Sequence, residues 1–373
     1  MRLALATALY ADATRLYRQG DLHHARDAAE EGLLSLSPGA HSGVTANHHL
    51  HGSVEPEKNT DRLSVGCEGL QAQQRRRHHL FGNILLLLSS IYMAVQDYIE
   101  AERLLVTCDG YWKERLAGTP TKASPAGTSG DAEGARCGDL DEGLAGVAYN
   151  RAVLLLERLQ CTPSLSPRRG DSSPWVAPLV DVCGVDARET HSSTSSSTVA
   201  TSPGTPEAVH ARAMAFLLEA QGHLAHTLGP PRRLLADVLH TLGVCHYEAA
   251  DYIAALEAWQ RSIAIRVHLH AQRLRTDHVT LQRDEGGGAG TEELKLALTM
   301  EHVAHVYQLL DGRSLHALKL LDTVAQTRRQ YLGPTHPLYV RTLAHQGVLA
   351  AELGHTRLAC ALFDPVQRHL QRH

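Results

Sequence analysis

The sequence predicts an all-α fold of about six helix-turn-helix repeats, and internal duplication is the first reason. The tripeptide Leu-Gly-Pro begins at Leu228 and again at Leu332, 104 residues later. A shift by 104 also superposes five further positions, namely Leu234 on Leu338, Leu239 on Leu343, Gly243 on Gly347, Ala255 on Ala359 and Trp259 on Phe363. Self-similarity at a fixed spacing is typical of chains built from stacked copies of one unit.

The repeated unit has the pattern of two helices joined by a short turn. Between Leu239 and Trp259, apolar or small residues recur at steps of three and four, with an interruption at Asp251. Gly243 and Ala255 have almost no side chain, so two antiparallel helices can approach closely there while the aromatic residue fills the space beside them. The phrase Asp-Tyr-Ile-x-Ala, found at 97–101 and again at 251–255, also indicates duplication.

This pattern resembles the tetratricopeptide repeat (TPR), a helix-turn-helix unit with large, Leu-Gly, Ala and aromatic positions in that order. The hexapeptide Leu-Gly-Pro-Thr-His-Pro at 332–337 narrows the resemblance to the 42-residue repeats of kinesin light chains. The spacing of the alanines at the small position of the unit agrees with a 42-residue repeat. Ala213 and Ala255 are 42 residues apart, as are Ala317 and Ala359. The resemblance implies a right-handed superhelical solenoid. No heptad region precedes the repeats, so a motor subunit is not implied.

Taken in order, the chain divides into repeats separated by inserts. The N-terminal apolar run continues its helical period up to Gly20-Asp21, so we interpret it as the first helix of repeat 1, although a short signal peptide is the alternative. In the fifth repeat (292–331), the helical pattern fits only if the turn between its two helices has one extra residue. The expected TPR ranges are 1–38 (repeat 1), 70–116 (repeat 2), 139–160 with 207–228 (split repeat 3), 229–270 (repeat 4), 292–331 (repeat 5) and 332–373 (repeat 6).

Three inserts, at 39–69, 117–138 and 161–206, are expected to be disordered. In the third, eleven of the sixteen residues from Thr190 to Thr205 are Ser or Thr. Such segments cannot bury enough apolar area to offset the entropy of ordering their backbone. The glycine-rich stretch at 286–290 is expected to be a linker. Ser-Pro and Thr-Pro dipeptides in or beside the inserts suggest phosphorylation sites, and Trp175-Val176 could fold back as an internal ligand.

Composition narrows the class of protein. The chain has 373 residues, of which 43% are hydrophobic and 20% charged, and its net charge is −4. This balance disfavours a general nucleic-acid or membrane-surface binder, which needs a basic excess. The seven cysteines form no C-x-x-C motif, and their odd number fits a reducing compartment. We therefore expect a cytoplasmic protein, with association with the cytoskeleton as an addition.

The sequence contains no motif that predicts a catalytic residue, a cofactor or a metal site. Phosphate-loop, dinucleotide, zinc-protease and nucleophile-elbow motifs do not occur in the sequence. His48, His49 and His51 lie in an expected loop without fixed geometry. His302 and His305 share a helix face, but a metal site needs further ligands that the sequence does not place. The chain is therefore not expected to be an enzyme.

In the TPR family, the first helices of successive repeats line a concave groove that holds a peptide or a partner helix. Asn150 stands where kinesin-light-chain repeats often carry an asparagine that hydrogen-bonds a peptide backbone. The carboxylate clamp of chaperone-binding repeats is not visible. By register, the expected groove residues are Tyr10, Tyr149, Asn150, Asp237, His240, Val244, Tyr247, His305, Arg341 and Val348.

The function that follows is a non-enzymatic scaffold or adaptor that binds a protein or peptide partner, without nucleic acid or membrane. Two alternatives stay open, a structural component of a cytoskeletal or ciliary assembly and a targeting subunit of an enzyme complex. The sixth repeat has no additional polar helix over its outer side, and solenoid ends need cover. Either a partner or another copy of the chain covers this end, which makes self-association through the uncapped repeat a further expectation, or the natural protein continues.

Overall fold

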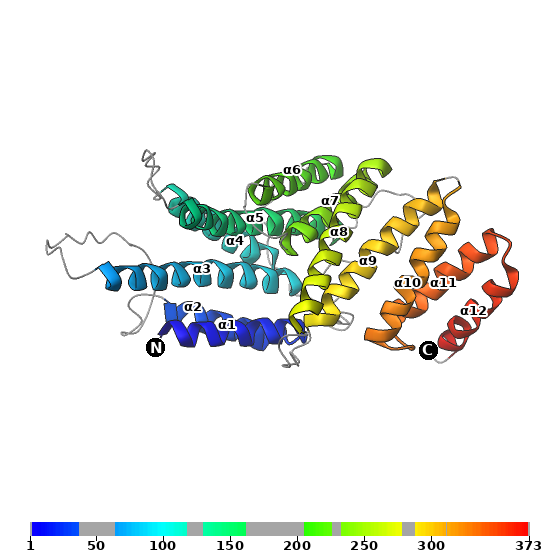
Figure 1. The fold of residues 1–373 in the computed structure, drawn as a ribbon, viewed down its shortest axis with the longest axis horizontal. Coiled ribbons are helices and arrows are strands. Elements are labelled where there is room, and N and C mark those ends of the chain that lie inside the picture. The colour runs from blue at the N-terminus through cyan, green and yellow to red at the C-terminus, as the bar shows by residue number, and fades with distance from the viewer. Residues whose placement is uncertain are drawn as a thin grey trace, which may run out of the picture. The chain divides into compact units, whose positions relative to one another are not determined.

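A computed structural model describes residues 2–36, 64–117, 130–161, 205–225, 233–277, 288–310 and 312–371. These residues form twelve α-helices and no β-strand. Figure 1 shows and labels the helices. The predicted all-α class is confirmed. The chain divides into two compact units, unit 1 with helices α1 to α5 and unit 2 with helices α7 to α12. Helix α6 (Pro206–Ala225) contributes residues 210–222 to unit 2 and its two ends to unit 1.

Unit 1 is built from two helical hairpins and a fifth helix. Helix α1 packs along α2, α3 packs along α4, and α4 and α3 both contact α5. The bounds are Arg2–Arg18 for α1, Leu22–Leu36 for α2, Ser64–Ala94 for α3, Tyr98–Ala117 for α4 and Gly130–Cys161 for α5.

Unit 2 consists of three hairpins in succession. Helices α7 and α8, α9 and α10, and α11 and α12 pack in pairs, and each pair contacts the next through α8 with α9 and α10 with α11. The bounds are Arg233–Glu248 for α7, Tyr252–Asp277 for α8, Gly288–Leu309 for α9, Ser314–Leu332 for α10, Pro337–Glu352 for α11 and Thr356–Leu370 for α12.

The turns inside the hairpins share one backbone design. In the α7–α8 turn, Ala250 has a positive φ of 61°, its N–H donates to the carbonyl of Tyr247, and the next N–H, of Asp251, donates to that of His246. This is the Schellman end of a helix. The Asp251 carboxylate then accepts from the N–H of Ala254 and caps α8. The predicted turn at Asp251 is confirmed.

The α9–α10 turn differs by one residue. The other four hairpins have three residues between their helices, whereas residues 310–313 make four. The left-handed residue of this turn is a glycine, Gly312, with φ of 78°. The extra turn residue that the sequence predicts for this hairpin is therefore present.

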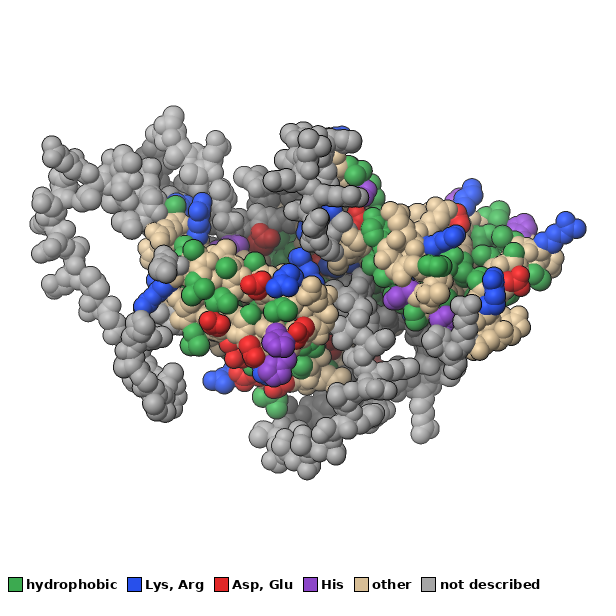
Figure 2. Space-filling model, turned by 90° about the horizontal axis from the view of Figure 1, so that it is seen from below, with side chains coloured by type: hydrophobic (Ala, Val, Ile, Leu, Met, Phe, Trp, Pro, Cys, Tyr) green, Lys and Arg blue, Asp and Glu red, His purple; other side chains and the backbone are tan. Residues whose placement is uncertain are grey.

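Two exposed histidine–aspartate contacts lie near the start of α2 in unit 1. His23 Nδ1 lies 3.2 Å from Asp27 Oδ2, and His24 Nδ1 lies 2.7 Å from Asp21 Oδ2. Figure 2 shows histidine and acidic side chains gathered on the molecular surface. Exposed pairs of this kind contribute little to stability, because water and salt screen them.

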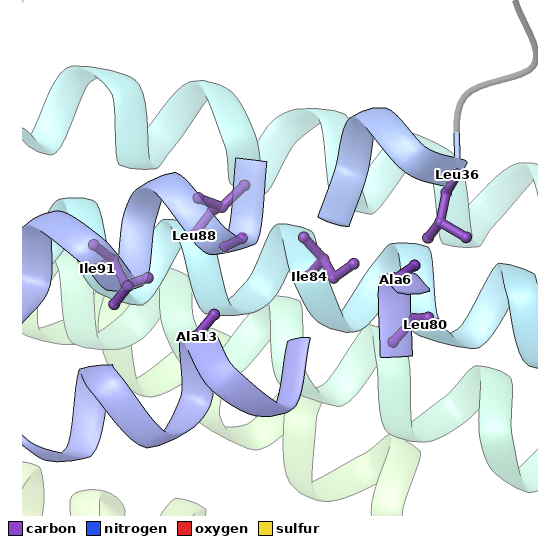
Figure 3. Packing of buried hydrophobic residues seen from close by; sticks show 9 residues of the cluster. Ala6, Ala13, Leu36, Leu80, Ile84, Leu88 and Ile91 are labelled. Atoms are coloured by element: carbon purple, nitrogen blue, oxygen red, sulfur yellow. The ribbon is translucent and has the colours of Figure 1, made fainter. Parts of the chain in front are cut away.

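The core of unit 1 is apolar. Ala6 and Ala13 of α1 are fully buried against Ile84, Leu88 and Ile91 of α3, as Figure 3 shows. Small residues on one helix and branched aliphatic residues on the other allow the two backbones to lie close together. Burying such side chains removes apolar surface from water, at about 25 cal/mol per Å².

Glycines of the first helices receive aromatic rings from the second helices. A Cβ added at Gly243 would lie 2.3 Å from Nε1 of Trp259, and that Nε1 donates to the carbonyl of His240 at 3.0 Å. A Cβ at Gly347 would lie 2.8 Å from the ring of Phe363. Ala255 is fully buried beside Trp259. The close approach predicted from these small residues is confirmed.

Three helices begin earlier than the sequence predicts. Helix α3 starts at Ser64 inside the expected 39–69 insert, α5 starts at Gly130 inside the 117–138 insert, and α9 starts at Gly288 inside the expected linker. Extending an existing helix costs little per residue. On α9, a Cβ at Gly290 would lie only 3.0 Å from the ring of Tyr331, so glycine permits a close contact there. The insert residues 39–63, 118–129 and 162–204, with His48, His49, His51 and Trp175 among them, lie outside the described residues.

Within the described part of the chain, no helix combines the length and the apolar character that crossing a membrane requires.

Candidate functional site

Helices α7, α9 and α11, the first helices of the three hairpins in unit 2, run in the same direction. The ring of His240 lies 5.3 Å from that of His302, and Tyr247 lies 5.7 Å from His305, so numbering rises together on α7 and α9. On α11, the ring of His345 lies 5.9 Å from His305. The side of the three helices that carries these residues is called the first-helix face below.

At the N-terminal end of the face, the carboxylate of Asp237 on α7 is paired with two cationic side chains. Asp237 Oδ1 lies 2.5 Å from Nη2 of Arg266, and its Oδ2 lies 3.2 Å from Nζ of Lys295. Arg266 also pairs with Glu292 at 2.9 Å, and its side chain is only 1% exposed. Burial alone would raise the pKa of Asp237, but the two cations lower it.

A second buried ion pair joins α9, α10 and α11. Arg328 donates from both Nη atoms to Glu301, at 2.9 and 2.6 Å, and also to Oγ1 of Thr342. Arg341 lies 3.4 Å from the same carboxylate. Burial alone would raise the pKa of Glu301, but Arg328 and then Arg341 lower it to about 2. The carboxylate therefore stays ionised and holds three helices together.

The middle of the face contains buried imidazoles. His302 stacks on Trp259 with centroids 5.1 Å apart, and burial lowers the pKa of His302 to about 4. His240 is 2% exposed, its Nδ1 lies 2.9 Å from Oγ1 of Thr299, and burial lowers its pKa well below the usual value. The repeat register predicts His240 as a groove residue. The structure corrects this, because Thr299 and His302 of α9 contact the ring, and the side chain is buried.

The C-terminal end of the face is more open. Gln308 accepts from Nε2 of His345 at 2.8 Å and donates to Oε2 of Glu352 at 3.0 Å. Val348 lies between these two α11 residues on the same helix face, and it is 45% exposed. Leu309, at the end of α9, is 49% exposed. Aliphatic and hydrogen-bonding groups are therefore available together at this end.

The three expected groove residues of unit 1 have contacts inside that unit. Tyr10 is half-buried and packs against the α1–α3 core. The amide nitrogen of Asn150 donates to Oγ of Ser89 at 3.1 Å and lies 3.4 Å from the carbonyl of Leu86. Tyr149 is half-buried beside it. The amide expected to bind a peptide backbone thus contacts α3 in this structure.

Among the expected residues of unit 2, Tyr247 contacts His305 of α9, and Arg341 contacts Glu301 of α9. Asp237 is paired with Arg266 and Lys295, Val244 packs against the core cluster of Ala255 and Trp259, and Val348 is exposed. Sequence reasoning missed Glu301, Gln308, Leu309, Glu352 and the buried arginines. The sequence contained one signal that could have found the buried arginines, their common position in the repeat. Arg266 stands eleven residues after Ala255, and Arg328 stands eleven residues after Ala317, so the same repeat position carries arginine twice. Among the described residues, no group of three or more His, Cys, Asp or Glu side chains is placed to hold a metal ion.

Comparison with known proteins gave structural matches alone. No protein family matches the sequence, and no curated protein does. TPR-like repeats of a protein described as a kinesin light chain from Podosopora anserina align at 13% identity, over 77% of this chain and 94% of that one, with a TM-score of 0.38. The nuclear import adaptor Nro1 from S. pombe aligns at 11% identity, over 98% and 93%, with a TM-score of 0.47. In its paired helices and glycine–aromatic contacts, this chain resembles TPR-like helical repeat proteins.

Proposed function

We propose that the chain is a non-enzymatic adaptor that binds a segment of a partner protein on the first-helix face of unit 2. The observation that supports this most is the contrast between the two ends of the face. The N-terminal ionic groups contact one another, whereas Val348 and Leu309 expose aliphatic surface beside hydrogen-bonding side chains. Interfaces commonly combine a small apolar centre with polar groups at its margin.

Photo-crosslinking in the full-length chain tests this proposal. A photoreactive amino acid at Val348 should capture a partner, whereas the same residue at Ile253 should not. Ile253 is the matched control because it is 71% exposed but lies on α8, a second helix of a hairpin. Equal capture from both positions would contradict the proposal. The captured protein also separates the alternatives, since filament proteins indicate a structural component and a catalytic chain indicates a targeting subunit.

A further inference from the structure

The C-terminal end of the first-helix face has a consistent negative character. Helices α7, α9 and α11 run parallel, so their C-termini, at Glu248, Leu309 and Glu352, lie at the same end of the face. The C-terminus of an α-helix carries a partial negative charge, because its last carbonyls point outward. Two of the three helices add a carboxylate to that charge.

These two carboxylates have no Lys or Arg partner within the described residues. Glu248 lies 3.3 Å from Nδ1 of His210, and Glu352 accepts from the Gln308 amide. The basic side chain of the α9–α10 turn, Arg313, lies over the Tyr307 ring at 5.3 Å. Burial without a strong cation also raises the pKa of Glu248 to about 7. A cation placed beside it would favour the ionised form.

The N-terminal end of the same face is different. Asp237 there is paired with Arg266 and Lys295, and Glu301, next to His302 in the middle of the face, is paired with Arg328 and Arg341. The carboxylates of the face are thus balanced by the protein's own cations at one end and not at the other. Exposed aliphatic groups, on Val348 and Leu309, lie at the unbalanced end.

From this juxtaposition we infer that the occupant of the face is a basic, apolar partner segment. An apolar side chain of the segment packs on Val348 and Leu309, and a neighbouring Lys or Arg pairs with Glu352 or Glu248. This inference rests on the proposed function, and it specifies the chemistry of the partner. Complementary charge selects partners and speeds their association, while the apolar contact supplies affinity.

Selection from a random peptide library, displayed against the full-length chain, tests the inference. The expected consensus has an aliphatic or aromatic residue within a few positions of Lys or Arg. The selected peptide should bind the Glu352→Lys variant at least about tenfold more weakly, because reversal replaces attraction with repulsion. Its affinity should also fall as salt rises.

The matched control is Glu257→Lys, an exposed glutamate of α8 outside the face, which should keep the affinity of the unaltered chain. Thermal unfolding of each variant checks that the fold persists. An acidic or uncharged consensus that still binds at Val348 overturns the inference and leaves the adaptor proposal intact. Equal binding by Glu352→Lys and Glu257→Lys also overturns it. If no peptide binds and Val348 captures no partner, the proposed function itself fails.

Discussion

Units 1 and 2 share one hairpin design but fill their interiors differently. In the described part of unit 1, Ser89 is the one buried polar side chain, and the remaining buried residues are apolar. The interior of unit 2 contains two arginines and a glutamate, with several further polar groups. The polar members are Ser262, Arg266, Thr299, Glu301, Arg328, His240, Thr241, Thr342, His345 and Gln346. Stacked hairpins thus tolerate a polar interior when its charges are paired.

One repeat position shows the difference most clearly. Eleven residues after the buried alanine of the second helix, unit 2 has Arg266 and Arg328, whereas unit 1 has Trp112 after Ala101. Trp112 fills the space beside two glycines of unit 1, while unit 2 uses Trp259, four residues after its alanine. The ring that packs on glycine can therefore come from either of two turns of the helix, which leaves the other position for an ion pair.

The largest expected effect comes from breaking the ion pair of unit 2. The substitution Arg328→Ala should lower the free energy of unfolding by about 3–5 kcal/mol, because it leaves Glu301 buried without its main partner. Denaturant unfolding measures the loss, and hydrogen exchange should locate it in unit 2. The double variant Glu301→Leu with Arg328→Met removes both charges and should lose less. A greater loss in the double variant would show that the pair itself, rather than the uncompensated charge, stabilises the unit.

The corresponding test in unit 1 concerns packing. A Cβ at Gly82 would lie 2.1 Å from the ring of Trp112, which is 2% exposed. The variant Gly82→Ala should therefore lose about 1–3 kcal/mol of unfolding free energy through overpacking. Its control is Gly110→Ala on α4, where a Cβ has nothing within 4 Å. That change should gain up to about 1 kcal/mol through helix propensity. Similar values for both variants would refute the predicted contact.

Low pH should destabilise unit 2 more than unit 1. Burial lowers the pKa of His302 to about 4, whereas in the unfolded chain it lies near the ordinary 6.5. The unfolded state therefore binds more protons below pH 6.5, and unit 2 loses stability as the pH falls from 6.5 towards 4. At pH 5 the loss from this residue is about 2 kcal/mol. Unfolding free energies from pH 7 to 5 measure the slope, which His302→Gln should reduce.

Glu248 opposes this trend, because burial raises its pKa to about 7 and protonation between pH 7 and 4.5 favours the folded state. The comparison is therefore made in a Glu248→Gln background. In unit 1, burial also raises the pKa of Glu157 to about 7, while His23 and His24 lie exposed. Hydrogen exchange should show acid opening in unit 2 before unit 1. An unchanged slope in His302→Gln would contradict the assignment.

The sequence was sufficient for the features that depend on local pattern. Helix pairing, the Gly243–Trp259 contact and the extra turn residue near Gly312 follow from spacing alone, because helical period and small residues act over short distances. Burial of His240 was not predictable in this way. A histidine suits a helix surface as well as a core, and only the approach of α9 determines which applies.

The early starts of α3, α5 and α9 were missed for a related reason. Composition shows how much apolar surface a segment can bury, but a helix can extend into a glycine-rich stretch once its neighbours have nucleated it. Likewise, the partners of Glu301 come from α10 and α11, and no local pattern indicates which of many charged residues will meet. Charges are placed by tertiary packing, so their pairing required the structure.

The smallest expected effect concerns the turns, where both units depart from the glycine rule. Gln96 of unit 1 and Ala250 of unit 2 have positive φ, at 62° and 61°, where Gly20 and Gly354 occupy the equivalent places. An L-residue in this region costs about 1–2 kcal/mol, and part of this is offset because glycine makes the unfolded chain more flexible. Ala250→Gly and Gln96→Gly should therefore each raise the unfolding free energy by about 0.5–1 kcal/mol. The reverse change, Gly354→Ala, should lower it by a similar amount, as thermal or urea unfolding would measure. Equal gains in both units would mean that the turn is a shared local device, independent of whether the interior beside it is apolar or ionic.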